Sequence, residues 1–70
     1  MNNTHRRLEA ARAALARAAW ARGARPLYEQ DAVIDLLVDI RHLCAANGFD
    51  FARCDHLAWS HYQHEAGSAS

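Results

Sequence analysis

Cysteine and histidine, the side chains most able to bind zinc or to act as nucleophile and base, gather in the segment HLCAANGFDFARCDH. His42 and Cys44 precede Asn47-Gly48, and Cys54 and His56 follow it. Residues two apart on a helix point about 200° apart, so neither His–Cys pair can bind one ion from an intact helix. Structural zinc sites also prefer other spacings. The pattern therefore predicts two cysteine thiols directed into a core and two histidines directed to solvent.

A second set of ligand-type residues lies at helical spacings. Asp39 and His42 are three residues apart, and His61 and Glu65 are four apart. Such pairs build carboxylate metal sites in helical bundles, so a metal-binding helical hairpin is one alternative function. The interpretation that we favour is a hydrogen bond between Asp39 and His61 that closes the edge of the core. No metal and no cofactor is then expected.

Catalysis and membrane insertion are not indicated. A chain of 70 residues leaves little volume for a cleft around Cys54 and His61, and it has no glycine-rich phosphate-binding loop. We therefore predict that the protein is not an enzyme. It has no apolar run long enough to span a membrane, and its first residues lack the apolar region of a signal peptide. A cytoplasmic location is expected, with both cysteines as thiols.

Composition favours an all-α fold. Half of the chain is apolar (51%), and it has only three glycines and one proline. We predict one domain over residues 1–66 and a disordered tail at 67–70. An Arg/Ala-rich N-terminal helix packs across a C-terminal antiparallel helical hairpin, whose helices span about 31–46 and 50–65.

Capping residues and apolar periodicity define these helices. Thr4, Asp31 and Asp50 are the predicted N-caps, while Gly23 and Asn47-Gly48 are the predicted stops. Apolar residues at helical spacing predict the buried face of each helix. In the first helix these are Leu8, Ala11, Leu15, Ala18 and Ala19; in the second, Val33, Leu36, Leu37, Ile40, Leu43 and Cys44; in the third, Phe51, Cys54, Ala58 and Tyr62.

Charge is distributed unevenly although the net charge is zero. Residues 1–25 contain six arginines and one glutamate, and residues 26–70 contain two arginines and seven acids. Arginines of this density can neutralise phosphates, so a nucleic-acid-associated protein that uses the N-terminal helix is another alternative. The arginines do not align on one helical face, however, and the acidic remainder would repel phosphate. Direct nucleic-acid binding is therefore the less favoured function.

Protein recognition is the function that best fits the remaining features. Aromatic and arginine side chains are the usual anchors of interfaces, and a thin core cannot bury both tryptophans. An acidic face can in addition meet a basic partner surface. The predicted partner-binding residues are Arg12, Arg17, Trp20, Arg22, Asp35, Asp39, Arg41 and Trp59. A hairpin with spare aromatic residues can also complete its core as a homodimer.

Residues 35–65 resemble short uncharacterised proteins of phages and mobile elements from high-GC bacteria. The matching residues are Asp35-Leu36-Leu37, Asp39, Arg41-His42, Asp50-Phe51, Ala58, His61-Tyr62 and Glu65. The resemblance implies an origin on such an element and a host-cell cytoplasmic location. By analogy, it also implies a stoichiometric inhibitor of a host defence complex, of the anti-CRISPR type. We therefore expect a small non-enzymatic protein-binding module.

Overall fold

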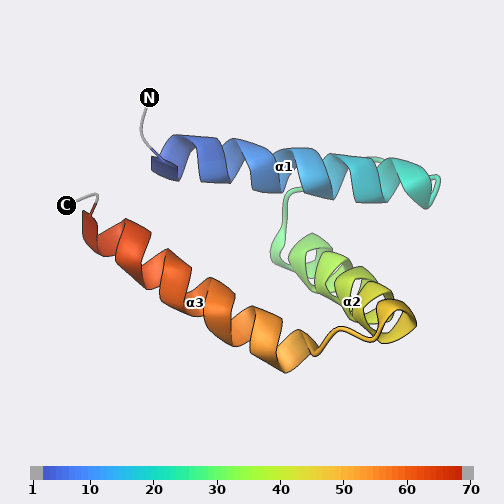
Figure 1. Cartoon of the computed structure of the whole chain (residues 1–70). Coiled ribbons are helices and arrows are strands. Elements are labelled where there is room, and N and C mark those ends of the chain that lie inside the picture. Colours follow the sequence, from blue (N-terminus) through green and yellow to red (C-terminus); the bar gives the residue numbers. More distant parts are fainter. Residues whose placement is uncertain (1–2, 69–70) are drawn as a thin grey trace.

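A computed structural model describes residues 3–68 and shows three α-helices in this range (Figure 1). α1 spans Asn3–Ala21, α2 spans Gln30–Asn47 and α3 spans Phe51–Ser68. α2 and α3 run in opposite directions, and α1 packs across them. The predicted all-α fold, with its C-terminal hairpin and Arg/Ala-rich first helix, is confirmed. The predicted tail at 67–70 overlaps the last two residues of α3, and residues 69–70 lie outside the described range.

Glycine ends the first two helices, as predicted. Gly23 and Gly48 have φ angles of 75° and 72°, a left-handed conformation that costs side-chain-bearing residues about 1 kcal/mol or more. The next residue closes the same motif each time, because Ala24 N donates to Ala19 O and Phe49 N donates to Cys44 O, both at 2.8 Å. These bonds close the last turns of the two helices and give each of the two carbonyls a second donor, beside Arg22 N and Gly48 N respectively.

The helix starts agree with the prediction at α3 only. Asp50 caps α3, because its Oδ1 accepts a hydrogen bond of 3.1 Å from Arg53 N. The predictions for Thr4 and Asp31 are wrong, since α1 begins at Asn3 and α2 at Gln30, which places both residues inside the first turn. Asp31 still favours the start of α2, because a carboxylate there interacts well with the helix dipole.

The buried core is small and lies where α1 crosses the hairpin. Among the residues whose side chains are described, only Leu15, Ala16, Ala19 and Cys44 are buried. The prediction of an inward Cys54 is wrong, because this thiol is exposed. Both cysteines are free.

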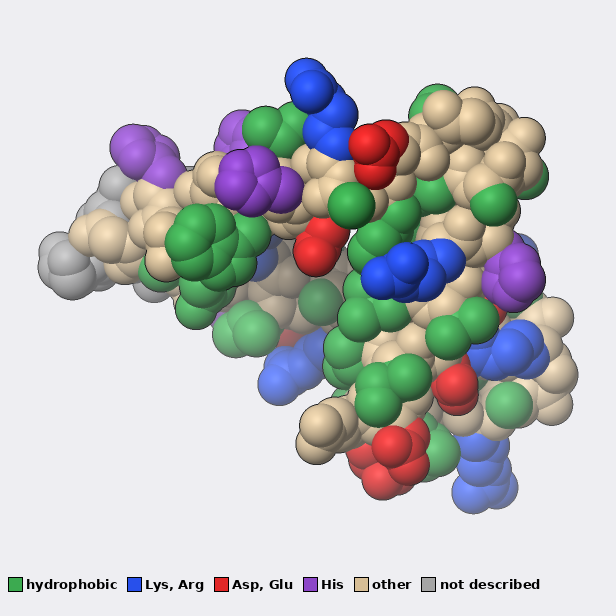
Figure 2. All heavy atoms as spheres, turned by 90° about the horizontal axis from the view of Figure 1, so that it is seen from below, with side chains coloured by type: hydrophobic (Ala, Val, Ile, Leu, Met, Phe, Trp, Pro, Cys, Tyr) green, Lys and Arg blue, Asp and Glu red, His purple; other side chains and the backbone are tan. Residues whose placement is uncertain are grey.

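Much of the predicted apolar faces is also uncovered. In α2, Leu36 and Ile40 are half-buried, whereas Val33, Leu37 and Leu43 are exposed. The physical reason is that the helices diverge from their contact points (Figure 1), and the space-filling view shows a hollow beside α2 on the side toward α3 (Figure 2). The Cα radius of gyration is 13.6 Å, against about 11 Å for a compact chain of this length. The three helices therefore form an open arrangement.

Candidate protein-interaction surface

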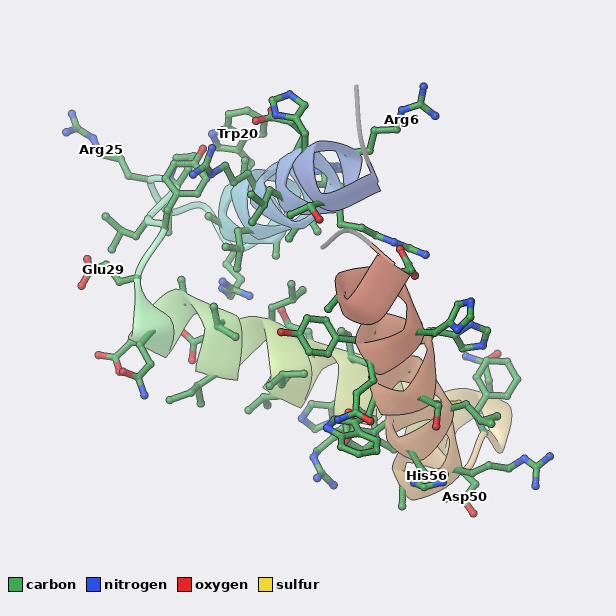
Figure 3. All side chains as sticks on the ribbon, turned by 90° about the vertical axis from the view of Figure 1, so that its left-hand side faces the viewer. Arg6, Trp20, Arg25, Glu29, Asp50 and His56 are labelled. Atoms are coloured by element: carbon green, nitrogen blue, oxygen red, sulfur yellow. The ribbon has the colours of Figure 1, made fainter. Side chains whose placement is uncertain are left out.

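The outer face of α1, defined by Arg6, Arg17 and Trp20, lies opposite the side that packs on α2. Arg6 and Arg17 are eleven residues apart and Trp20 follows three later, so all three project from one side of the helix. Figure 3 shows Arg6 and Trp20 extending away from α2. The helix surface between them carries alanines, and Trp20 is 62% exposed. An exposed aromatic side chain therefore lies one turn from Arg17, while Arg6 lies about 21 Å from Trp20 toward the N-terminus, on the same side of the helix.

Ion pairs divide the arginines of the N-terminal third into two groups. Arg7 pairs with Glu65 at 2.9 Å and Arg12 with Glu9 at 3.5 Å, while Arg22 pairs with Asp39. Within residues 3–68, the remaining three arginines make no ion pair. These are Arg6, Arg17 and Arg25. In the N-terminal third, the positive charge left without an acidic partner within residues 3–68 therefore lies on the outer face of α1 and in the connection that follows it.

The predicted partner-binding residues do not form one surface. Arg17 and Trp20 lie on the outer face of α1, whereas Arg12 forms an ion pair within that helix and the Arg22–Asp39 pair joins α1 to α2. The other three occupy separate places. Asp35 borders a small hollow between α1 and α2, Arg41 stacks over the Phe51 ring with its guanidinium carbon 4.2 Å from the ring centroid, and Trp59 is exposed on α3.

The expected hydrogen bond between Asp39 and His61 does not form. Asp39 faces α1 and accepts a hydrogen bond from Arg22. His61 instead borders a hollow between α1 and α3. The reason is that α3 leaves α2 after its first turns, so residues at the same hairpin level do not meet. Nor does any group of three His, Cys, Asp or Glu side chains within residues 3–68 come close enough to hold a metal ion.

A bidentate ion pair joins the start of α1 to the end of α3. Arg7 Nε and Nη2 donate to Glu65 Oε1 and Oε2, both at 2.9 Å. These hydrogen bonds lower the pKa of Glu65 from its ordinary value and raise the pKa of Arg7. The pair borders a hollow of about 600 Å³, also lined by Leu8, Ala58, His61 and Tyr62. Charge pairing therefore holds these two helix ends together across a poorly filled space.

Acidification should weaken this contact. The pKa of Glu65 is lower in the folded chain than in the unfolded one, so its contribution to stability is complete above the ordinary carboxyl pKa and is lost as the pH falls through the lowered value. We expect Glu65→Gln to destabilise the chain at neutral pH. Below about pH 4.5 the difference from wild type should shrink progressively. Urea unfolding measured over a pH series tests this.

The control for this experiment is the arginine partner. Arg7→Gln should cause a similar loss at neutral pH, and adding Glu65→Gln to it should have little further effect. A Glu65→Gln effect that persists unchanged in the Arg7→Gln background, or that grows on acidification, would contradict the proposed cause.

Comparison with protein-family models, with curated proteins and with solved structures found no match to this chain. None of the helices within residues 3–68 is both long and apolar enough to cross a membrane.

Sequence reasoning missed part of the basic surface. Arg6 and Arg25 were not among the predicted partner-binding residues, yet both lack an ion-pair partner within residues 3–68. The eleven-residue spacing from Arg6 to Arg17 was a signal that could have placed Arg6 on the same side of the helix as Trp20. No local pattern could have shown that Arg7 and Arg22 pair with Glu65 and Asp39, because these partners are distant in sequence.

Proposed function

We propose that this chain is a non-enzymatic protein-binding module that presents the outer face of α1 to an acidic surface of a partner protein. The observation that carries the proposal is the exposure of Trp20 one turn from Arg17, on the side of α1 that also carries Arg6. Tryptophan and arginine are the residue types most enriched at energetic hot spots, where an aromatic ring enters a pocket of the partner. An unpaired arginine one turn from that ring, with a second farther along the same side of the helix, favours a partner whose acidic surface extends beyond the pocket.

The resemblance of residues 35–65 to phage and mobile-element proteins extends this proposal. On that reading the partner is a component of a host defence complex, and the chain inhibits it by occupying a functional surface. Stoichiometric binding suits a chain of this size, because blocking a surface needs an exposed anchor and no catalytic cleft. The resemblance supports the identity of the partner, whereas the exposed Trp20 supports the mode of binding.

Affinity capture with matched variants tests the proposal. The full chain, Trp20→Ala, Arg17→Glu and Trp59→Ala serve as baits in a lysate of the bacterial host, and the recovered protein is then purified and titrated. Loss of a hot-spot tryptophan should weaken binding by about 30-fold or more. Because the Trp20 side chain is largely exposed, Trp20→Ala should leave the midpoint of urea unfolding unchanged.

The variants also distinguish specific binding from nonspecific adsorption of lysate proteins. A partner that requires Trp20 and Arg17 and is retained by Trp59→Ala supports the outer face of α1 as the binding site. Failure to recover any protein whose capture depends on Trp20 contradicts the proposal. A partner that depends on Trp59 alone would move the binding site to α3.

Nucleic-acid association is the second candidate, favoured by the three arginines of the N-terminal third that lack ion-pair partners within residues 3–68. Arg6, Arg17 and Arg25 could contact phosphates while Trp20 stacks on an unpaired base. Releasing counterions from about three phosphates would make the affinity for a short single-stranded oligonucleotide fall steeply between about 50 and 200 mM salt. Binding to a protein partner through a central aromatic anchor should depend less on salt.

A further inference from the structure

The apolar stripe of α2 consists of four adjacent side chains that the rest of the described chain leaves about half exposed. Their exposed fractions lie between 42% and 50%, and together they extend over the first half of the helix. They are Val33, Ile34, Leu37 and Val38. Seen from below, hydrophobic side chains gather along α2 beside the hollow that separates it from α3 (Figure 2). A continuous apolar row of this kind usually packs against another helix.

We infer that a second copy of this chain covers the stripe, so that two α2 helices pack antiparallel about a two-fold axis. This inference goes beyond the proposed function, because it uses another face of the molecule. It leaves the outer face of α1 free in both copies. A two-fold arrangement is the commonest symmetry of homo-oligomers, and it places the same patch on both sides of the interface.

The accessible surface has the size that such a dimer requires. The chain exposes 5920 Å², whereas a compact monomer of 7.8 kDa exposes about 4,400 Å². The excess is about 1,500 Å² for each chain. Part of this excess belongs to the hollow between α1 and α3. Removing about half of it from each of two copies would bury about 1,500 Å² in total, the size of a standard specific interface.

Charges at the two ends of the stripe favour the antiparallel arrangement. Asp31 lies in the first turn of α2, before the stripe, and Arg41 lies one turn after it, where its stacking on Phe51 holds the guanidinium. The stripe is centred near residues 35–36. Antiparallel packing therefore brings each Arg41 opposite Asp31 of the other copy, whereas parallel packing would set Asp31 against Asp31. The antiparallel dimer has two attractive Asp31–Arg41 pairs, whereas the parallel dimer would place like charges opposite each other at both ends of the stripe. This difference favours antiparallel packing of the two α2 helices.

Sedimentation and light scattering on the full chain test the dimer. We expect a mass of about twice 7.8 kDa at micromolar concentrations. Leu37→Lys should raise the dimer dissociation constant by about 100-fold or more, since an unpaired charge would enter the interface. Leu43→Lys is the control, because Leu43 is also exposed (57% against 42% for Leu37) but lies on another side of α2, so this variant should leave the dimer intact. Circular dichroism checks that both variants remain helical.

Charge exchange tests the direction of packing. Asp31→Arg and Arg41→Asp should each weaken the dimer, and the double variant should restore it. The inference is overturned if the wild-type chain is monomeric or if Leu37→Lys leaves the dimer intact. It is also overturned if a different protein, and not a second copy of the chain, is found to cover the apolar stripe of α2. Failure to restore the dimer overturns the antiparallel arrangement. None of these outcomes touches the proposed function, because Trp20→Ala should bind its partner poorly while remaining dimeric.

Discussion

Replacing Leu15 with alanine is expected to lower the free energy of unfolding by about 2–4 kcal/mol. Leu15 is only 9% exposed, and it is the largest of the four buried side chains within the described chain. It lies where α1 meets the start of α2, beside Ala19, Ala32 and Leu27. A chain of this length has about 4–10 kcal/mol of stability in total. One truncation at this position should therefore remove a large part of it.

Leu8→Ala provides the matched control. It makes the same substitution in the same helix, so the change in helix propensity is equal, but Leu8 is 52% exposed. Its loss should be about 1 kcal/mol or less. Urea unfolding must be followed at one protein concentration, because association would add a concentration-dependent term. Equal losses at the two positions would show that Leu15 does not anchor α1.

Helix positions could be predicted from sequence because their signals are local. Gly23 and Gly48 occupy backbone conformations that disfavour other residues, and the Asp50 side chain bonds to an amide three residues away. The N-cap of α2 lies two residues before the predicted one, because Glu29 occupies this position without a side-chain hydrogen bond. Asp31 has the right chemistry for a cap, but the backbone is already helical there.

The packing could not be predicted in the same way. Apolar periodicity identifies which side of α2 avoids water, but it does not identify what covers that side. It therefore assigned Val33 and Leu37 to the core of one chain, although both are exposed. The position of Asp39 depends on a contact with Arg22 across two helices. Such contacts follow from the angles between helices, which short connections leave undetermined.

The two proposed surfaces would act together if both form. A dimer formed through α2 would present two copies of the outer face of α1, each with its own Trp20. Binding of the first face to an oligomeric partner would raise the effective concentration of the second, and the combined affinity could exceed that of one face by orders of magnitude. A Leu37→Lys monomer should then bind an oligomeric partner more weakly than the wild-type dimer does, although its Trp20 is intact.

Ala19→Leu should destabilise the chain by about 1–3 kcal/mol, for a reason opposite to that of Leu15→Ala. Ala19 is 5% exposed at the crossing of α1 and α2, and its small side chain allows the helices to approach closely. A leucine would force them apart and lengthen the contact between Arg22, one turn later, and Asp39.

Ala13→Leu is the control for this change, because Ala13 is exposed on α1 and leucine and alanine are both strong helix formers. It should change the unfolding free energy by less than about 0.5 kcal/mol. Arg22→Ala made in the wild-type and Ala19→Leu backgrounds then tests the mechanism, since the effect of losing this ion pair should be smaller where the helices are already separated. If Ala19→Leu has the same free energy of unfolding as the wild type, α1 can move away from α2 without loss of stability. The close approach of the two helices would then contribute little to the stability of the fold.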